Sequence, residues 1–263
     1  MTVITLTTDF GLRDGYDGVL KGVIWSILPG ASIADISHTI APQNILEGAV
    51  VLSRAAFYFP PGTVHLAVID PGVGTARRAI VLRAGEHTFV GPDNGLFTLI
   101  LEAADRRNWP VRVVHLDKPQ YWLPRISRVF HGRDIFAPAA AHLAAGVSLG
   151  EIGTPITDPI RLDIPRPART AGGWTGHILV IDTFGNCSAD VGLDQLGGRE
   201  IRTIRVGGVE IHGMVNAFGD RPEGELIALF DSSDSLSICM VNGSAARRLG
   251  AVPGTPIEVY YAE

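Results

Sequence analysis

An aspartate and two consecutive arginines lie close together in a glycine-rich stretch, Asp70-Pro71-Gly72-Val73-Gly74-Thr75-Ala76-Arg77-Arg78. Short apolar runs precede and follow this stretch, which predicts a loop between two strands. Active sites of α/β proteins commonly carry a carboxylate at the end of a buried strand, followed by a loop that can fold tightly. A tight turn with a surface ion pair is an equally good interpretation of this stretch alone.

Two further motifs place polar side chains at the ends of predicted elements. In Thr8-Asp9-Phe10-Gly11 the carboxylate of Asp9 can accept two hydrogen bonds from the hydroxyls of a ribose. Asp14 precedes the next predicted helix, which favours a role as its N-cap. In Phe130-His131-Gly132-Arg133-Asp134 the imidazole of His131 can exchange a proton near neutral pH, and Gly132 allows a ligand to approach closely. A packing role for this single histidine is the alternative.

The C-terminal part of the chain carries a third polar motif, Asp182-Thr183-Phe184-Gly185-Asn186. The amide of Asn186 contains both a donor and an acceptor, which suits the edge of a purine ring, although Gly-Asn is also common in plain turns. The stretches Asp231-Ser232-Ser233-Asp234 and Val241-Asn242-Gly243 are consistent with hairpin ends or with groups that bind a polar ligand. The histidines lack His-x-x-x-His spacing, so we predict no metal site.

Strands and helices alternate through residues 1–163, which predicts an N-terminal α/β domain with a mostly parallel sheet. A stretch at about 164–173 that contains Pro165 and Pro167 predicts a linker. Apolar alternation with few helix signals over residues 174–263 predicts an all-β, barrel-like domain. The predicted strands span residues 3–6, 32–36, 64–69, 79–82, 88–90, 111–115, 175–181, 201–206, 209–214, 225–230, 236–241 and 257–261, and the predicted helices span residues 16–28, 44–58, 96–104 and 135–145.

The composition narrows the class of protein. The formal net charge of the 263-residue chain is −5, and its lysines and arginines form no long run, which argues against a nucleic-acid-binding protein. No apolar run approaches the ~20 residues of a membrane span, and the N-terminus lacks the pattern of a signal peptide. Cys187 and Cys239 are far apart in sequence and are expected to be free, buried thiols. We therefore expect a soluble, cytoplasmic protein that binds neither nucleic acid nor membrane.

Five motifs, taken in order, resemble those of a known enzyme family. They are Thr7-Thr8-Asp9-Phe10-Gly11, the stretch from Asp70 to Arg78, Gly91-Pro92-Asp93-Asn94-Gly95, Phe130-His131-Gly132-Arg133-Asp134 and Asp182-Thr183-Phe184-Gly185-Asn186. As a set they are similar to the motifs of adenosine-forming S-adenosyl-L-methionine (SAM) hydrolases, also called SAM hydroxide adenosyltransferases. This family is related to the SAM-dependent fluorinase and chlorinase.

The resemblance implies a fold, an assembly and roles for individual residues. It implies an N-terminal α/β domain, a C-terminal β-barrel domain, SAM as the substrate, and no metal or other cofactor. It also implies a homotrimer, with each active site between the N-terminal domain of one subunit and the C-terminal domain of the next. The implied catalytic residues are Asp70, Arg77 and His131, and the implied substrate-binding residues are Asp9 for the ribose, Asn186 for the adenine edge, Asp182 and Ser232 for the methionine part, together with Phe130 and Gly132. Arg78 is left with a structural salt bridge.

The chemistry of this substrate indicates what the catalytic residues would do. A sulfonium leaves as a neutral thioether without a general acid, so the difficulty lies in activating and aligning the water that attacks C5′. Arg77 would stabilise developing hydroxide, and Asp70 would fix Arg77 and accept a hydrogen bond from the water. His131 would complete the shell of the water or take its proton, and the sequence leaves the identity of the base open.

Three other functions remain compatible with the sequence. The first is a SAM-dependent halogenase that forms a 5′-halo-5′-deoxyadenosine. The second is a Ca²⁺-dependent nucleoside hydrolase, suggested by the carboxylates of Asp9, Asp14 and Asp17 near the N-terminus. The third is a non-catalytic module that binds SAM or adenosine.

Overall fold

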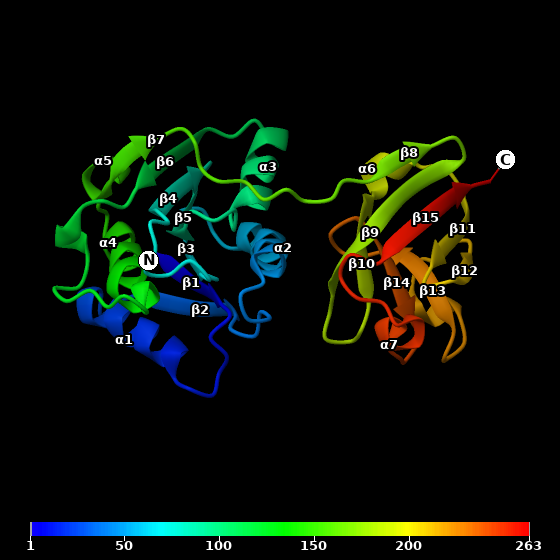
Figure 1. The fold of residues 1–263 in the computed structure, drawn as a ribbon, viewed down its shortest axis with the longest axis horizontal. Helices are drawn as coiled ribbons and strands as arrows, with labels where there is room; N and C mark the ends of the chain where they lie inside the picture. The colour runs from blue at the N-terminus through cyan, green and yellow to red at the C-terminus, as the bar shows by residue number, and fades with distance from the viewer. Residues whose placement is uncertain (1, 263) are drawn as a thin grey trace. The chain divides into compact units, whose positions relative to one another are not determined.

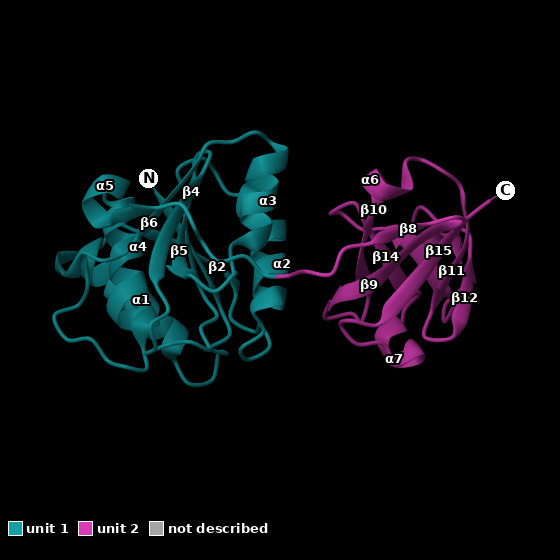
Figure 2. Cartoon of the chain, turned by 45° about the horizontal axis from the view of Figure 1, so that its top comes forward, with its two compact units in different colours: residues 1–162 teal, residues 163–263 magenta. Residues whose placement is uncertain are grey.

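The computed structural model describes residues 2–262 and divides the chain into two compact units, of which unit 1 ends at Leu162 and unit 2 begins at Asp163 (Figure 2). Each unit has its own sheet and its own core of buried hydrophobic side chains. Over the described part of the chain, no helix has the length and apolar character needed to cross a membrane.

Unit 1 is built on a seven-stranded sheet in the order β2-β1-β3-β5-β4-β6-β7 (Figure 1). Its strands are β1 (Val3–Thr8), β2 (Ser32–Ser37), β3 (Val64–Val68), β4 (Ala79–Ala84), β5 (His87–Pro92), β6 (Val111–His115) and β7 (Thr154–Ile156). Strands β2, β1, β3 and β5 are parallel neighbours, whereas β4 and β7 run opposite to their partners, so five strands share one direction. Since β1 and β3 are parallel and adjacent, the residues that follow them emerge at the same edge of the sheet.

Helices cover both faces of this sheet (Figure 1). They are α1 (Tyr16–Ile27), α2 (Ile45–Ala55), α3 (Thr98–Arg106), α4 (Ala137–Ala144) and α5 (Leu149–Ile152), with short turns η1 (Ala56–Tyr58), η2 (Pro119–Tyr121) and η3 (Gly132–Phe136). Helices α1 and α4 share one core cluster with the sheet, and α2 and α3 share the other. This is the layered arrangement in which a sheet buries both of its faces.

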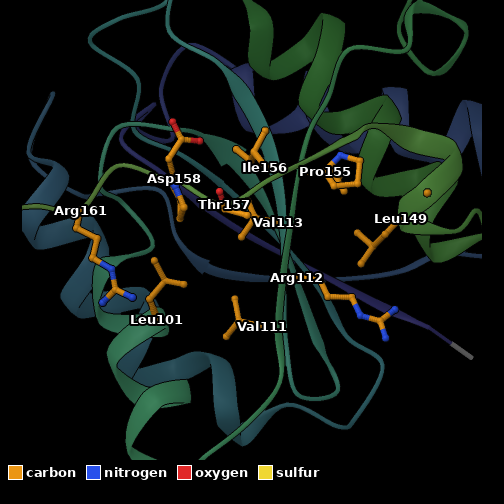
Figure 3. A pocket seen from close by; sticks show the side chains of 13 residues that line it. Leu101, Val111, Arg112, Val113, Leu149, Pro155, Ile156, Thr157, Asp158 and Arg161 are labelled. Carbon is orange, nitrogen blue, oxygen red and sulfur yellow. The ribbon is translucent and has the colours of Figure 1, made fainter.

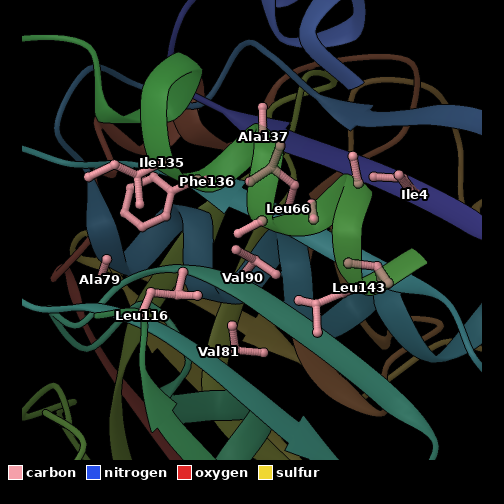
Figure 4. Packing of buried hydrophobic residues seen from close by; sticks show 14 of the residues in the cluster. Ile4, Leu66, Ala79, Val81, Val90, Leu116, Ile135, Phe136, Ala137 and Leu143 are labelled. Carbon is pink, nitrogen blue, oxygen red and sulfur yellow. The ribbon is translucent and has the colours of Figure 1, made fainter. Parts of the chain in front are cut away.

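Strand β3 lies at the centre of both core clusters and is buried along its whole length. Its side chains alternate between the faces, with Leu66 in the cluster of α1 and α4, and Ala67 in the cluster of α2 and α3. Phe136, which is fully buried, packs into the first of these clusters (Figure 4). Burying one such side chain contributes about 1.5–3 kcal/mol. Asp70, two residues after the end of β3, is therefore held on a rigid support.

Unit 2 is an antiparallel sheet in the order β12-β11-β15-β9-β10-β14-β13, with β8 paired to β9. Its strands are β8 (Ala168–Thr170), β9 (Gly173–Ile181), β10 (Cys187–Gly192), β11 (Ile201–Val206), β12 (Val209–His212), β13 (Leu226–Phe230), β14 (Ser235–Met240) and β15 (Pro256–Tyr261). The end strands β12 and β13 contact each other, so the sheet is nearly closed. The unit also contains α6 (Leu193–Leu196), η4 (Phe218–Asp220) and α7 (Ala245–Leu249).

The predicted fold class, a mostly parallel α/β part followed by a barrel-like all-β part, is confirmed. Three short strands were not predicted, namely β7, β8 and β10. Strand β8 (Ala168–Thr170) forms a hairpin with β9 inside the stretch 164–173 predicted as a linker. Strand β10, with the sequence Cys-Ser-Ala-Asp-Val-Gly, lacks a run of β-branched residues, and its pairing with β9 and β14 supplies the stabilisation that local propensity does not.

Two predictions at helix starts are wrong. The N-cap of α1 is Gly15, with φ at 74°, and no side chain caps this helix, so Asp14 does not have the predicted role. The helix begins at Tyr16, as predicted, but the residue before it is a glycine in the left-handed conformation, which glycine adopts without strain. The predicted helix 135–145 is confirmed over α4 (Ala137–Ala144), but the π-helical turn η3 (Gly132–Phe136) precedes it, so the helical segment begins earlier than predicted. Such wide turns occur often at functional sites.

Candidate active site

Asp70, Arg77 and His131 form one hydrogen-bonded cluster in unit 1. Arg77 donates from Nε to Asp70 Oδ1 at 3.1 Å and from Nη2 to Asp70 Oδ2, so this ion pair is bidentate. The same Nη2 lies 3.1 Å from His131 Nδ1. The guanidinium also lies over the ring of Phe136, 5.1 Å from its centroid. A guanidinium held from three directions presents its charge in a fixed orientation.

The glycine-rich loop after β3 lets Arg77 return to Asp70. Gly74 takes φ at +77°, and a Cβ atom there would lie 2.2 Å from the carbonyl oxygen of Arg128. Only glycine fits at this position, because it has no Cβ atom and tolerates positive φ. The close approach packs the loop against the segment that leads to His131, which brings the three side chains of the cluster together.

Arg78 points away from this cluster. It donates from Nε to Asp93 Oδ2 at 2.8 Å and from Nη1 to Asp158 Oδ1 at 2.9 Å. Asp93 is only 1% exposed, so this pair fixes a buried carboxylate of the Gly91-Pro92-Asp93-Asn94-Gly95 motif. Consecutive residues in an extended backbone point to opposite sides, which explains the division between Arg77 and Arg78. The predicted structural salt bridge of Arg78 is confirmed.

Burial shifts the two titratable groups of the cluster toward their neutral forms. It raises the pKa of Asp70, and the charge and hydrogen bonds of Arg77 act in the opposite direction. Burial lowers the pKa of His131, and the positive charge of Arg77 lowers it further. Near neutral pH the imidazole is therefore neutral, while the ion pair with Arg77 favours the ionised form of Asp70.

The partner of the imidazole decides which of its nitrogens carries the proton. A guanidinium can only donate, so Nδ1 of His131 accepts from Arg77 and the single proton of the neutral ring lies on Nε2. His131 is thus an acceptor toward Arg77 and a donor at its other nitrogen. Asp70 carries acceptor lone pairs beyond those that Arg77 uses, since each carboxylate oxygen accepts two hydrogen bonds.

Three aromatic rings stand next to this cluster. Phe10, Tyr16 and Phe130 contact one another edge to face, with ring centroids 5.3 to 6.1 Å apart. A Cβ atom added to Gly132 would lie 3.2 Å from Phe10 and 3.4 Å from Phe130. The structure therefore brings the predicted residues Phe130 and Gly132 together with His131, and adds Phe10 and Tyr16, which the sequence did not single out as ligand contacts.

Asp9 lies at the same edge of the sheet as Asp70, because it follows β1 and Asp70 follows the neighbouring parallel strand β3. The carboxylate of Asp9 accepts a hydrogen bond at Oδ2 from the backbone N–H of Gln43, at 2.7 Å. The carboxylate of Asp17 pairs instead with Lys21, at 3.4 Å. Among residues 2–262, no group of three or more acidic, histidine or cysteine side chains is arranged to hold a metal ion.

In unit 2, Asp182 and Asn186 line a cavity of about 590 Å³. Asp182 Oδ2 accepts from the side-chain amide of Asn186 at 2.8 Å, which orients that amide. Phe184 and Phe218 line the same cavity and are 77% and 43% exposed. Two exposed rings and an oriented amide suit a flat heteroaromatic ligand. Phe218 was missed because nothing in its own stretch of sequence links it to Asn186; only the tertiary fold does.

Ser232 is not part of this cavity. It lies in the turn between β13 and β14, where Asp231 Oδ1 accepts from the N–H groups of Ser233 and Ser235. The cavity contains Met240, at the other end of β14. The structure therefore places Asp182, but not Ser232, in the lining of this cavity.

A further depression in unit 1, of about 590 Å³, lies along β6 and β7 (Figure 3). It is lined by apolar side chains such as Leu101, Val113 and Ile156, with Asp158 and Arg161 among its polar lining residues. None of the predicted site residues lines it. The predicted catalytic residues lie instead in the hydrogen-bonded cluster around Arg77.

An α/β unit with an Asp-Arg-His cluster, followed by a barrel-like unit with a cavity lined by Asn186 and two phenylalanines, defines a two-domain class of proteins. The model of the SAM hydroxide adenosyltransferase N-terminal domain matches residues 4–153, and that of the C-terminal domain matches residues 176–258. The chain belongs to this family.

Individual relatives agree with this assignment. The (R)-S-adenosyl-L-methionine hydrolase of Salinispora tropica is 40% identical over 261 residues, covering 97% of this chain and 97% of the relative. A solved structure of a conserved protein from Thermotoga maritima matches with a TM-score of 0.90 at 36% identity, covering 97% of this chain and 99% of its own. A fluorinase of an Actinoplanes species is more distant, at 29% identity over 211 residues and 70% of each chain.

Proposed function

We propose that this protein hydrolyses SAM to adenosine and L-methionine by attack of an activated water on C5′. The observation that carries the proposal is the cluster of Asp70, Arg77 and His131, in which a fixed guanidinium lies between a carboxylate and a neutral imidazole. A relative 40% identical over nearly the whole chain carries the name (R)-S-adenosyl-L-methionine hydrolase. The family membership supports SAM as the substrate.

The roles of the three side chains follow from their hydrogen bonds. Arg77 stabilises developing hydroxide, because an oriented positive charge in a poorly solvated site favours the anion. Asp70 accepts the proton of the attacking water, since its pKa is raised by burial and its oxygens keep free lone pairs. His131 holds Arg77 through Nδ1 and is a donor at Nε2. As the C5′–S bond breaks, its electron pair stays on sulfur, and methionine leaves as a neutral thioether.

We propose that the remaining predicted residues bind the substrate. Asp9 accepts the ribose hydroxyls, and Phe130 and Gly132 line the space next to His131. Asn186 recognises the adenine edge, with Phe184 and Phe218 against the faces of the ring, and Asp182 orients Asn186. Asp182 and Ser232 are proposed for the methionine part. The mechanism uses no metal or redox cofactor, because the leaving group needs no acid and the oxidation states do not change.

We further propose a homotrimer in which unit 1 of one subunit and unit 2 of the next complete each site. The division of proposed binding groups between two separately folded units supports this arrangement. A cytoplasmic location is proposed as well, which the two free, buried cysteines support, since stable disulfides are rare in that compartment. Mixing the Arg77→Ala and Phe184→Ala proteins tests the shared site: activity of the mixture above that of either variant supports it, and activity that stays at the level of the separate variants contradicts it.

One assay separates the proposed hydrolysis from its alternatives. The protein is incubated with SAM in ¹⁸O-labelled water, and the products are separated by chromatography and weighed by mass spectrometry. Labelled adenosine with methionine is expected, and EDTA treatment should leave the rate unchanged. Intact SAM would indicate a binding module, 5′-halo-5′-deoxyadenosine on adding chloride or fluoride would indicate a halogenase, and loss of activity in EDTA would indicate the Ca²⁺-dependent alternative.

A further inference from the structure

We propose that Gln43 is a positioning residue for the ribose of the substrate: from a strained backbone conformation, its N–H fixes the carboxylate of Asp9. The proposal deepens the proposed function, because it rests on the assignment of Asp9 to the ribose hydroxyls. It concerns the hydrogen bond of 2.7 Å between the backbone nitrogen of Gln43 and Oδ2 of Asp9.

The backbone of Gln43 adopts an unusual conformation for its residue type, with φ at +65°. The other described residues of this kind, apart from glycines, are Asn108, Asp234 and Asn242. Asparagine and aspartate tolerate the left-handed region because their short side chains bond locally, whereas glutamine does not have this advantage. The strained residue thus contacts a proposed substrate-binding carboxylate, and strain of this kind persists where the surrounding structure imposes it.

The residues on both sides of Gln43 impose this conformation. Asn44 caps α2 by accepting at Oδ1 from the N–H of Glu47, at 3.1 Å. Glu47 Oε2 in turn accepts from the side chain of Asn44 at 3.0 Å and from the N–H of Ala41 at 3.2 Å. The chain before and after Gln43 is therefore tied to the first turn of α2, and the left-handed turn between these ties directs the N–H of Gln43 to Asp9.

The backbone around Asp9 is held independently by His38. The N–H of Gly11 donates to the carbonyl of His38 at 2.7 Å, and Thr8 Oγ1 lies 2.8 Å from His38 Nδ1. His38 is 3% exposed, so these contacts lie inside the fold. The backbone on both sides of Asp9 is fixed in this way. The remaining freedom is rotation of the carboxylate, which the hydrogen bond from Gln43 restricts.

A fixed carboxylate is what a cis-diol requires. Each carboxylate oxygen accepts two hydrogen bonds, so Asp9 can accept both ribose hydroxyls while Oδ2 keeps the bond from Gln43. Without that bond the carboxylate rotates, and one of the two hydroxyl contacts weakens. Because Asp9 touches the ribose and not the reacting atoms, the loss appears in binding rather than in the chemical step.

Binding of adenosine to purified variants tests the proposal without requiring turnover. Gln43→Val disfavours the left-handed backbone, whereas Gln43→Gly keeps it and keeps the N–H. We expect Gln43→Val to weaken adenosine binding about tenfold, the loss of about one charge-assisted hydrogen bond. Gln43→Gly should bind within about twofold of the wild type. Asn108→Val is the matched control: it creates the same backbone strain away from Asp9 and should leave adenosine affinity unchanged.

The comparison ligand is 2′,3′-dideoxyadenosine, which lacks both hydroxyls, so none of the Gln43 variants should change its affinity. In an Asp9→Ala background, Gln43→Val should have no further effect on adenosine binding. The proposal is overturned by unchanged adenosine binding in Gln43→Val, by equal losses for both nucleosides, by an equal loss in Gln43→Gly, or by a wild type that does not bind adenosine. A wild type that binds adenosine but leaves SAM intact would contradict the proposed hydrolysis and leave the proposed role of Gln43 standing.

Discussion

Replacing Arg77 by lysine keeps a positive charge in the candidate site but removes the fork that holds it. The guanidinium makes two bonds to Asp70, one contact to His131 at 3.1 Å, and one bond to the carbonyl of Arg78 at 3.2 Å. It also lies 5.1 Å from the centroid of the Phe136 ring. A single ammonium can reach one oxygen of Asp70, and it cannot reproduce the bidentate pair or hold the imidazole at the same time.

The size of the effect follows from these contacts. Hydrogen bonds to charged groups contribute about 1.5–3 kcal/mol each, and lysine keeps part of one pair, so the free energy of unfolding should fall by about 2–3 kcal/mol. An oriented donor aimed at a developing anion raises kcat by a factor of about 10²–10³. We therefore expect kcat of Arg77→Lys to fall by about that factor, while KM changes little, because the interaction belongs to the transition state.

Adenosine formation, measured by chromatography over a range of SAM concentrations, gives kcat and KM, and urea unfolding gives the stability. Arg78→Lys is the matched control, since Arg78 is the next residue and pairs with the buried Asp93. That variant should lose about 1–2 kcal/mol of stability and keep kcat within about twofold. The assignment fails if Arg77→Lys retains more than about a third of the wild-type kcat, or if Arg78→Lys loses as much activity as Arg77→Lys.

Three further substitutions have defined outcomes. Gly74→Ala, whose Cβ would lie 2.2 Å from a backbone oxygen, should lower the urea midpoint strongly, whereas Gly72→Ala, with no atom nearer than 3.5 Å, should not. Burial lowers the pKa of His65 to about 3, so the unfolded chain binds more protons below pH 6.5 and stability falls as the pH drops. Between pH 7 and pH 5, the free energy of unfolding of the wild type should therefore fall by about 2 kcal/mol more than that of His65→Gln. Equal falls for the two proteins would contradict the lowered pKa of His65. Phe184→Ala should weaken adenosine binding about tenfold, as loss of one stacking contact does, while Leu193→Ala, at another exposed apolar site of unit 2, should not.

Local pattern was sufficient for the elements that carry the unit 1 site. The apolar run 64–69 predicted a buried strand, and β3 spans Val64–Val68 with both faces covered. Asp70 follows that run, and Asp9 follows β1, so their common edge was implied once the strands were parallel neighbours. The resemblance of the motifs to those of a known family then predicted that His131 lies near Asp70 and Arg77, which hydrophobic periodicity alone could not predict.

Contacts between distant segments were not predictable in the same way. The choice between Arg77 and Arg78 came from resemblance, and the structural reason, that consecutive side chains point apart, appears only once Asp93 and His131 are in place. The contact of Gln43 with Asp9 could not be predicted, because it is made by a backbone N–H, which every residue type except proline has. Phe218 was missed for a related reason: its partners in the cavity come from distant segments, namely the turn between β9 and β10, the end of β14 and α7.

The charges of the cluster suggest why such a site would use water rather than a halide. Asp70 and Arg77 cancel as an ion pair, and His131 is held neutral by burial and by Arg77, so the cluster carries no net charge near neutral pH. In the proposed reaction a hydroxide-like nucleophile meets a sulfonium, and the two charges vanish together as the bond to sulfur breaks. A poorly solvated site favours that change, because the transition state is less charged than the reactants.

A halide arrives already charged and gains nothing from a proton acceptor, while the carboxylate of Asp70 repels it. Neutral water is not repelled, and the same carboxylate takes the proton that it must lose. Asp70 therefore has opposite effects on the two nucleophiles, which no other member of the cluster has.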